Sequence, residues 1–591
     1  MQKLFGTFIK SEPVEKGWSE DKKTCVTAKD GTKYLLRVSP ISRYETRKSL
    51  FTMLEKAAAL DIPMCVPVEF GTCEDGVYSI QSWIDGEDLE TVLPALSETE
   101  QYVLGLKSGE IIRKIHTLPA PETQEEWESR FNRKTDMKIK KYLACGLRFD
   151  GDEHILAYIE ENRHLLKKRP QSFQHGDYHV GNMMVERGEL TIIDFDRYDF
   201  GDPWEEFNRI VWSAAASPQF ATGQLRGYFG GEPPLAFFKL LAFYIAVNTL
   251  SSIYWAIPFG PSDLDTMMKQ AQDVLEWFDN MNNPKPTWYL DDVCVSQEID
   301  GVSYKLKEPY DFSFINKYGK VFKVFDEQGI NVCFGVDDGS RRYFVKFAGA
   351  KPINFDKCNG STVLAVEWLK KAVSVYRDCE HPSLIKFIYA EEIGGGYAAV
   401  FEWVDAEGIE PLNSPGHKRF MGMEIVKKIQ AFEDIMSFHA LAAAKGYVAI
   451  DFYDGSILYD YVNDQVIICD IDFYQKSPYV GEMGLWGSTR YVSPEECTPG
   501  AVMDEITIVY TMGATAFMLF NYDSETDIEW REQGVEFYRT RKFQDTPPKS
   551  WQLSAARYDV VRRAVHNDRD KRQQSIRQLI SEWKTAGQGD R

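Results

Sequence analysis

The sequence predicts an α+β protein built from two tandem domains of one architecture. At 591 residues the chain is longer than one ordinary domain. A Pro- and Asn-rich segment, DNMNNPKPTWYLDD at 279–292, divides it nearly in half, as a linker would. The two halves also repeat each other. We therefore expect domains at 1–283 and 301–591, joined by a linker at 284–300.

The repeat is clearest in one stretch of each half. DYHVGNMMVERGELTIIDFD (177–196) is echoed by DFYDGSILYDYVNDQVIICDID (451–472). In both stretches a leading Asp precedes a polar residue that opens an apolar hairpin, and the hairpin ends on another Asp. Further upstream, KYLLRVSP in the first half and RYFVKFAG in the second each precede an amphipathic helix. A repeat of this size indicates two domains rather than a solenoid.

Composition places the chain among packed globular proteins, with 44% hydrophobic and 14% aromatic residues. Its net charge of −21 argues against a nucleic-acid-binding surface. The ten cysteines show no C-x-x-C pair, which favours reduced thiols in a cytoplasmic protein over a zinc site or a disulfide framework. The N-terminus lacks the pattern of a secretory signal. The most apolar stretch is interrupted by Lys239 and Asn248, so a buried helix is expected there rather than a membrane span.

Three polar side chains around the first hairpin suggest phosphate chemistry. Two apolar runs, 183–185 and 190–193, flank a turn, which brings Asn182 and Asp194 to the same end. Asp177 stands on the loop leading in. In phosphoryl transfer Asp177 would orient the attacking hydroxyl and accept its proton, while Asn182 and Asp194 would hold Mg²⁺ against the phosphates. The alternative is that all three are ordinary turn residues, because Asp and Asn are common in turns.

With these motifs the first half resembles the aminoglycoside phosphotransferase family, which is similar to choline and macrolide kinases and is a relative of protein kinases. The resemblance implies a bilobal fold with a small antiparallel β lobe and a larger helical lobe. It implies ATP, or GTP, as phosphoryl donor with Mg²⁺, and a hydroxyl of a small molecule as acceptor. It makes Asp177 the catalytic base and Asn182 and Asp194 the metal ligands, with His175 bracing the catalytic loop.

The resemblance also implies a basic nucleotide clamp on the third strand. GTKYLLRVSP aligns Arg37 there, where most relatives carry Lys, and a permanently charged guanidinium can fork onto phosphate oxygens. Lys33, on the same strand face, is a reserve candidate. Glu45, at the start of the next helix, is the expected ion-pair partner of the clamp. The alternative for Glu45 is a solvated helix charge.

The phosphate acceptor must be bound by the helical regions at 100–170 and 204–280. Four acidic residues there could attract a cationic substrate, as aminoglycosides would require: Asp263, Asp265, Glu205 and Glu206. A solvated acidic surface is the favoured alternative. The family also phosphorylates sugars, choline and amino alcohols, so the resemblance implies the reaction and leaves the acceptor open.

The second half resembles serine/threonine protein kinases through DCEHPSLIKF, GSTRYVSPEE and HNDRDKRQQSIRQLISEW. The resemblance implies a protein substrate and a buried ion pair between Glu495 and Arg572. Its site residues would be the strand lysine, its helix partner, the base and two metal ligands: Lys346, Glu367, Asp451, Ser456 and Asp470.

This second site departs from the protein-kinase pattern. H-R-D has become Ala449-Ile450-Asp451, and Ser456 stands where the metal-binding Asn is expected. A hydroxyl can still ligate Mg²⁺, and Asp454 is close enough in sequence to substitute. The second half is therefore either a second kinase or a regulatory pseudokinase. A scaffold with two kinase folds and little turnover is the rival interpretation of the whole chain.

Overall fold

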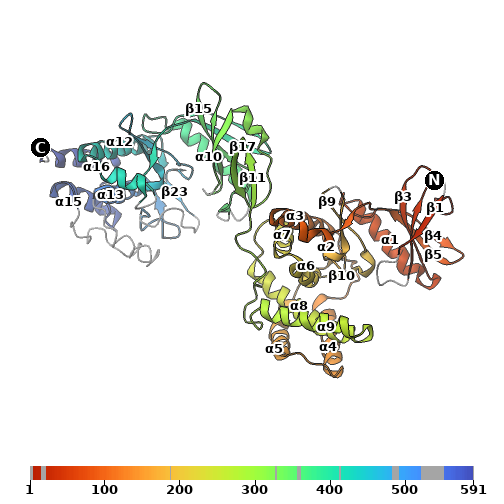
Figure 1. The fold of residues 1–591 in the computed structure, drawn as a ribbon. Helices are drawn as coiled ribbons and strands as arrows, with labels where there is room; N and C mark the ends of the chain where they lie inside the picture. Colours follow the sequence, from red (N-terminus) through yellow and green to blue (C-terminus); the bar gives the residue numbers. More distant parts are fainter. Residues whose placement is uncertain are drawn as a thin grey trace. The chain divides into compact units, whose positions relative to one another are not determined.

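The chain folds into two compact units. The computed structural model describes residues 4–14, 21–186, 188–326, 329–355, 361–410, 414–481, 491–520 and 551–589. The first unit comprises Met1–Ser296 with Lys307–Pro309, and the second comprises Gln297–Leu306 with Tyr310–Arg591 (Figure 1). The nine cysteines in the described ranges are all free thiols.

The first unit opens on a five-stranded antiparallel sheet with the order β1-β2-β3-β5-β4. Its strands are β1 (Lys10–Pro13), β2 (Lys22–Thr27), β3 (Lys33–Ser39), β4 (Pro67–Cys73) and β5 (Gly76–Ser82). Helix α1 (Tyr44–Ala58) packs on β4 and β5 and buries Leu50, Met53, Leu54 and Ala57. This spacing puts the four side chains on one helical face. The small lobe is therefore an antiparallel sheet with one covering helix, seen in red in Figure 1.

The larger lobe of the first unit is helical. Its helices are α2 (Leu89–Val92), α3 (Glu98–Ile115), α4 (Trp127–Ala144), α5 (Asp152–Asn162), α6 (Ile210–Ala216), α7 (Pro218–Phe229), α8 (Leu235–Ala256) and α9 (Pro261–Trp277). Short strands between them are β6 (Glu87–Asp88), β7 (Ser172–Gln174), β8 (Met183–Glu186), β9 (Glu189–Ile192) and β10 (Asp199–Gly201). Strands β6, β8 and β9 form one sheet, and β7 pairs with β10.

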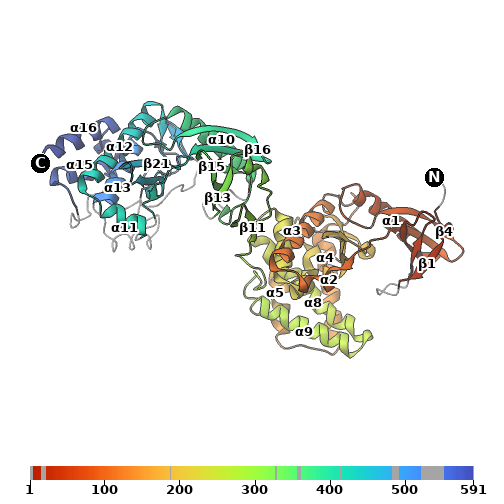
Figure 2. The same cartoon turned by 45° about the horizontal axis from the view of Figure 1, so that its top comes forward.

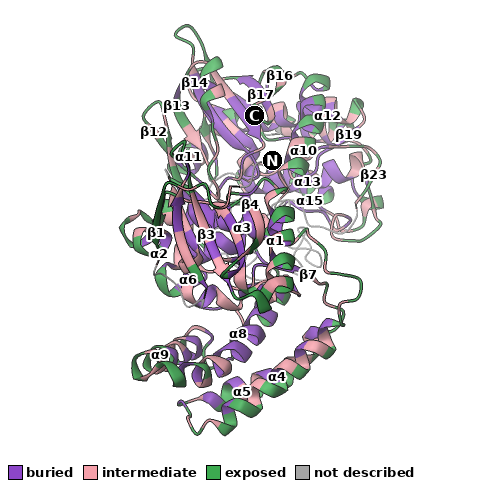
Figure 3. Ribbon diagram, turned by 90° about the vertical axis from the view of Figure 1, so that its right-hand side faces the viewer, coloured by how far each residue is buried: buried purple, intermediate pink, exposed green. Residues whose placement is uncertain are grey.

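Helix α8 is the apolar segment that was predicted to be a buried helix. Among the described residues, one helical segment, Leu235–Phe259, has the length and the apolar composition needed to cross a membrane. Most of this helix is buried inside the unit, where α4, α5 and α9 contact it (Figure 3). Because apolar side chains surround α8 on most sides, its sequence shows no one-sided apolar stripe.

Helices α3 and α7 approach each other more closely than side chains allow. A Cβ atom on Gly105 or Gly109 would lie 2.2 or 2.1 Å from a backbone oxygen of α7. A Cβ atom on Gly223 or Gly227 would lie 2.3 or 2.0 Å from a backbone oxygen of α3. The two G-x-x-x-G repeats are therefore required for the contact between these helices.

The second unit opens on a sheet of the same strand order, β13-β14-β15-β17-β16. Its strands are β13 (Lys320–Phe325), β14 (Val332–Asp337), β15 (Arg342–Ala348), β16 (Phe387–Ile393) and β17 (Gly396–Glu402). Helix α10 (Thr362–Asp378) follows β15 as α1 follows β3. A preceding hairpin, β11 (Val295–Ile299) and β12 (Val302–Leu306), adds Tyr304 and Leu306 to the sheet's core (Figure 2).

The larger lobe of the second unit is also helical, with α11 (Pro415–Met421), α12 (Ile425–Ala444), α13 (Glu505–Phe520), α15 (Ala555–Ala564) and α16 (Ile576–Ala586). Its short strands are β18 (Glu407–Gly408), β19 (Tyr447–Val448), β20 (Ile457–Asp460), β21 (Gln465–Ile468), β22 (Gln475–Lys476), β23 (Tyr479–Val480) and β24 (Val502–Met503). The buried guanidinium of Arg572 donates to both carboxylate oxygens of Glu495, at 2.7 and 3.0 Å. The ion pair expected for this lobe is present.

The stretch 284–300, where a linker was expected, contains packed side chains. Trp288 and Tyr289 are buried in the core of the first unit, and the Tyr289 hydroxyl donates to Glu232 at 2.6 Å. Arg226 donates to the backbone oxygen of Asp291 at 2.7 Å. The Pro and Asn residues mark turns here, and the aromatic residues between them bind the segment to the first unit.

Candidate active site

The hairpin β8–β9 places two predicted metal ligands at one end. Met183 pairs with Ile192 in the register, so Asn182 precedes one strand where Asp194 follows the other. The Ile193 amide donates to the Asn182 carbonyl at 3.0 Å, which extends the pairing beyond the strands. Asp194 takes a left-handed backbone conformation with φ of 64°. Its side chain is therefore set by the sharp turn at the end of the hairpin.

His175 braces the loop that carries Asp177. Its Nε2 donates to the Ile193 carbonyl at 2.9 Å, and its Nδ1 accepts from the Asp177 amide at 3.3 Å. The buried carboxylate of Glu206 accepts from the amides of His175 and Gly176 at 2.6 and 2.9 Å. His175 therefore has the bracing role expected from the resemblance. Glu206, for which the sequence suggested either a solvated acidic surface or attraction of a cationic substrate, instead fixes the loop.

Gly176 is required by the same loop. Its φ of 84° lies in the left-handed region. A Cβ atom there would meet the backbone oxygen of Arg197 at 1.8 Å. A side chain would therefore push the Asp177 loop away from the segment that follows Asp194.

Asp177 is a half-buried carboxylate close to two guanidinium groups and one imidazole. Arg209 Nε lies 3.4 Å and His179 Nε2 3.7 Å from its Oδ1, and Arg197 Nε lies 3.8 Å from its Oδ2. Burial alone would raise the pKa of Asp177, but the His179 hydrogen bond and the two guanidinium charges outweigh it and hold the pKa well below its usual value. Asp177 is therefore ionised over the physiological pH range.

Arg37 lies where the clamp was predicted, on β3, and is buried. It forms a short hydrogen bond with Asp196, and its Nη2 lies 3.6 Å from Asp194 Oδ1. Asp196 also accepts from Arg47 of α1 at 2.8 Å. Asp194-Phe195-Asp196 thus joins the hairpin to both the sheet and helix α1.

The expected pairing of Arg37 with Glu45 is wrong. Glu45 lies exposed in the first turn of α1, and in the described part of the chain the ion pairs of Arg37 reach Asp21, Asp194 and Asp196. Arg47, two positions further along α1, faces the sheet and makes the helix-to-site contact instead. Lys33, the reserve candidate, is exposed and pairs with Asp85 at 3.3 Å, apart from the Asp194 motif.

Two side-chain oxygens near the hairpin end are suited to a hard cation. Asp194 Oδ1 is buried without a hydrogen-bond partner in the described structure. Asn182 Nδ2 donates to the Asp177 carbonyl at 2.8 Å, which leaves the amide oxygen of Asn182 for another ligand. A carboxylate oxygen and an amide oxygen fit Mg²⁺, which takes one or two protein ligands and completes its shell with phosphate oxygens and water.

The second unit repeats this arrangement with a lysine. Lys346 Nζ lies 2.9 Å from Asp470 Oδ1 and 2.8 Å from Asp472 Oδ2. Burial would lower the pKa of Lys346, but these two carboxylates raise it well above its usual value. Tyr376 of α10 donates to Asp472 at 3.0 Å. The second aspartate again joins the strand to the helix.

The expected pairing of Lys346 with Glu367 is also wrong. Glu367 lies exposed on α10, while Lys346 contacts the two aspartates. The sequence analysis gave Asp470 as the metal aspartate and did not include Asp472, yet both contact the lysine. The signal available in the sequence was the D-x-D pattern present in both halves.

Ser456 takes the position that Asn182 has in the first unit. Ile457 pairs with Ile468, and the Cys469 amide donates to the Ser456 carbonyl at 2.9 Å. The Ser456 Oγ is buried without a hydrogen-bond partner in the described structure. Asp451 and Asp470 have φ of 59° and 53°. A second potential cation ligand therefore stands at the same place on the second hairpin.

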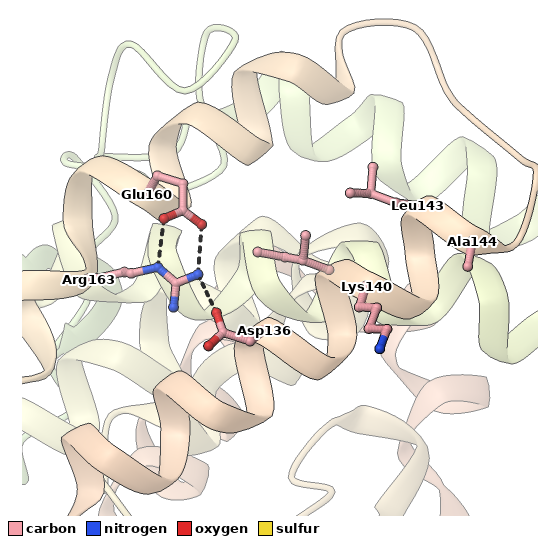
Figure 4. A pocket seen from close by; sticks show the side chains of 7 residues that line it. Asp136, Lys140, Leu143, Ala144, Glu160 and Arg163 are labelled. Carbon is pink, nitrogen blue, oxygen red and sulfur yellow. Dashed lines mark hydrogen bonds and ion pairs between the residues drawn. The ribbon is translucent and has the colours of Figure 1, made fainter.

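A separate cavity lies between α4 and the α5 end, and its lining includes none of the site residues described above (Figure 4). It has a volume of 460 Å³, and its acidic side chains are paired: Arg163 contacts Glu160 at 2.7 Å and Asp136 at 2.8 Å. Figure 4 shows that Arg163 lies between these two carboxylates. The residues that line this cavity show no arrangement suited to phosphate chemistry.

Comparison with known proteins finds a family match in the first unit. Residues 10–238 match the model of the Phosphotransferase enzyme family. No curated protein matches the chain.

Several solved structures are similar to part of the chain. A thermostable mutant of aminoglycoside phosphotransferase APH(4)-Ia is 20% identical, with a TM-score of 0.35, over 46% of this chain and 96% of its own. A further variant of that mutant protein was solved as a ternary complex with ADP and hygromycin B. A choline/ethanolamine kinase family protein from Mesorhizobium loti is 15% identical, with a TM-score of 0.37, over 48% of this chain and 94% of its own.

Proposed function

We propose that the first unit, which contains the match to the Phosphotransferase enzyme family, transfers the γ-phosphate of ATP, or of GTP, to a hydroxyl of a small molecule. One observation carries the proposal. Asp194 Oδ1 is buried without a hydrogen-bond partner in the described structure and lies 3.6 Å from Arg37 Nη2 of the sheet, at the hairpin end that Asn182 shares. A cation ligand and a phosphate-binding guanidinium side by side are what nucleotide phosphates require.

The residues divide the chemistry between them. The Asp177 carboxylate accepts the hydrogen bond and then the proton of the acceptor hydroxyl, whose oxygen forms a bond to the γ-phosphorus. The bond from that phosphorus to the bridging oxygen breaks, and the nucleoside diphosphate leaves with the electron pair. Arg37 neutralises phosphate charge at the sheet. Mg²⁺, held by Asn182 and Asp194, would neutralise further charge on the phosphates.

For the second unit we propose nucleotide binding, either as a second kinase acting on proteins or as a regulator of the first. The support is the shared arrangement of Lys346, Asp470 and Ser456. The hydroxyl of Ser456 is a weaker Mg²⁺ ligand than an amide or carboxylate oxygen, which favours the regulatory role. We further propose that the protein is cytoplasmic.

Two substitutions in the full-length protein separate binding from chemistry. Asp177→Asn is expected to lower phosphoryl transfer by about 10²- to 10⁴-fold, because it removes the proton acceptor. It should leave binding of an unreactive ATP analogue with Mg²⁺ largely unchanged. Asp194→Asn is expected to weaken nucleotide binding itself.

Asp273→Asn, a substitution of an α9 carboxylate that pairs with Lys269 at 2.9 Å, is the matched control and should change neither quantity. ADP release and calorimetric titration of the analogue provide the two readouts. Wild-type transfer by Asp177→Asn would show that another group accepts the proton and would contradict the assignment.

A further inference from the structure

The charges around Asp177 bear on which acceptor it serves, an inference that rests on the proposed phosphotransfer. Both carboxylate oxygens of Asp177 face a guanidinium group, Arg209 at Oδ1 and Arg197 at Oδ2. The hydroxyl of the acceptor must reach this same carboxylate. The acceptor therefore enters a place where two guanidinium groups already lie.

These two arginines have no other carboxylate in the part of the chain that the structure describes. The ion pairs of Arg197 and Arg209 reach Asp177 alone. Other arginines of the same lobe each have a dedicated carboxylate: Arg130 contacts Asp199 at 2.6 Å, and Arg169 contacts Asp202 at 2.6 Å. One carboxylate shared by two guanidinium groups leaves a net positive charge at Asp177.

The acidic side chains near the loop do not offset this charge. Glu205 contacts Lys134 at 3.6 Å and accepts from Gln174 at 3.2 Å. The carboxylate of Glu206 accepts hydrogen bonds from two backbone amides of the catalytic loop. Neither is available to a cationic substrate, so the cationic acceptor that these carboxylates first suggested is not supported here.

Helix α4 adds a further cation to the same region. Lys138 follows Lys134 by one helical turn. Burial, together with the charges of Lys134 and Arg209, lowers the pKa of Lys138 to about 7 against the opposing charge of Glu205. The charge of Lys138 therefore interacts with that of Arg209, one of the two guanidinium groups at Asp177. An anion bound there would favour the charged form of Lys138.

We propose that the acceptor is an anionic hydroxyl compound, a carboxylate or a phosphate ester, anchored by Arg209 and Arg197. A cationic acceptor would have to approach against both guanidinium groups. An anionic acceptor would accept hydrogen bonds from both guanidinium groups. The carboxylate oxygens of Asp177 would then be available to the hydroxyl of the acceptor. Arg209 comes from η6 (Glu205–Arg209), whereas the proposed nucleotide residues lie on β3 and the β8–β9 hairpin.

The test compares hydroxyl compounds that differ in charge. Full-length protein with Mg²⁺ and ATP is screened against equal numbers of anionic, neutral and cationic compounds, including gluconate, glucose 6-phosphate, glucose and glucosamine. Carboxylates and phosphate esters form separate arms. Thermal stabilisation by the same compounds, with an unreactive ATP analogue present, reports charge preference without turnover. Hits are expected among the anions.

Arg209→Gln sharpens the test. It is expected to raise KM for an anionic acceptor about 10- to 100-fold while KM for ATP stays unchanged, because one charge-assisted contact is lost. Arg209→Lys should retain part of the affinity. Arg133→Gln, a substitution of an exposed arginine on α4 paired with Glu125, is the matched control and should retain the wild-type preference.

Three results would overturn the inference: a screen without anionic hits, hits that are mainly cationic, or an Arg209→Gln effect on ATP equal to that on the acceptor. The last result would assign Arg209 to the nucleotide phosphates. Failure of the proposed phosphotransfer gives a different result. ADP formation would then be absent or insensitive to Asp177→Asn, whatever charge preference the stabilisation measurement shows.

Discussion

At the scale of single residues, the second aspartate of each D-x-D motif organises the site. Asp196 contacts Arg37 of the sheet and Arg47 of α1, and Asp472 contacts Lys346 of the sheet and Tyr376 of α10. In both units the strand cation is therefore connected to the helix through an aspartate beyond the hairpin. Movement of the helix would change the charge balance at the first aspartate as well.

Removing Arg37 is expected to destabilise the first unit. Arg37→Gln leaves Asp194 and Asp196 with one fewer cation in a largely buried place, at a cost of about 3 kcal/mol. Arg37→Lys keeps the positive charge but loses the forked donors of the guanidinium group, so the loss of stability should be smaller. Urea unfolding of the full-length variants measures both.

Arg133→Gln removes an exposed ion pair and should cost less than about 1 kcal/mol. Equal effects of Arg37→Gln and Arg133→Gln would contradict the role given to Arg37.

The residues that sequence reasoning found are those whose placement is local. Asn182 and Asp194 flank one short hairpin, whose register follows from its two apolar runs. The ion pairs were harder to predict from the sequence, because Arg37 and Asp196 stand 159 positions apart in the chain. Glu45 was assigned by analogy with a lysine–glutamate pair. The helix faces the sheet through Arg47 instead, and no local pattern distinguishes one position from the other.

At the scale of elements, the α3–α7 pair supports the catalytic loop. The Tyr178 hydroxyl donates to the Ser108 carbonyl of α3 at 2.7 Å, and Gln224 of α7 donates to Ser108 Oγ at 3.0 Å. Tyr178 directly follows Asp177. The close approach of the two helices therefore sets the position of the residue next to the proposed base.

Enlarging a glycine in this contact should be costly. Gly109→Ala or Gly223→Ala is expected to destabilise the first unit by about 3 kcal/mol and to lower phosphoryl transfer, because the helices must separate. Gly231→Ala, with no atom within 4 Å of the added Cβ, should stay within about 1 kcal/mol of wild type. Thermal unfolding and ADP release would be measured together. A neutral Gly223→Ala would show that the helices can separate without cost.

Helix α12 carries a buried histidine that should make the second unit sensitive to acid. His439 Nδ1 donates to the Ile435 carbonyl at 2.8 Å, and its Nε2 accepts from the Tyr474 hydroxyl at 2.8 Å. Burial lowers its pKa from 6.5 to about 4. Below pH 6.5 His439 is protonated in the unfolded chain but stays neutral in the folded chain until about pH 4. The free energy of unfolding therefore falls as pH falls through this window.

Between pH 7 and pH 5 this group should remove about 2 kcal/mol of stability. His439→Gln is expected to reduce that pH dependence, although the variant is less stable at pH 7. His154→Gln, a substitution of an exposed histidine on α5, should leave it unchanged. Urea unfolding at the two pH values gives the comparison, and an unchanged slope in His439→Gln would contradict the burial argument.

At the scale of the whole molecule, two units share a sheet order, a hairpin register and a cation–D-x-D contact. They differ at residues that we propose to take part in turnover. The first has Asn182 and the Asp177 loop held by His175 and Glu206, while the second has Ser456 and no basic residue before Asp451 in Ala449-Ile450-Asp451. We therefore expect small-molecule chemistry to depend on the first unit alone.

The most direct test is phosphoryl transfer from ATP with Mg²⁺ by wild type, Asp177→Asn and Asp451→Asn, with the charge-sorted hydroxyl compounds and a generic protein as acceptors. Asp177→Asn is expected to lower transfer to the small molecule by about 10²- to 10⁴-fold, whereas Asp451→Asn should leave it intact. Transfer at the wild-type rate by Asp177→Asn, or its loss in Asp451→Asn alone, would contradict the assignment of the reaction to the first unit.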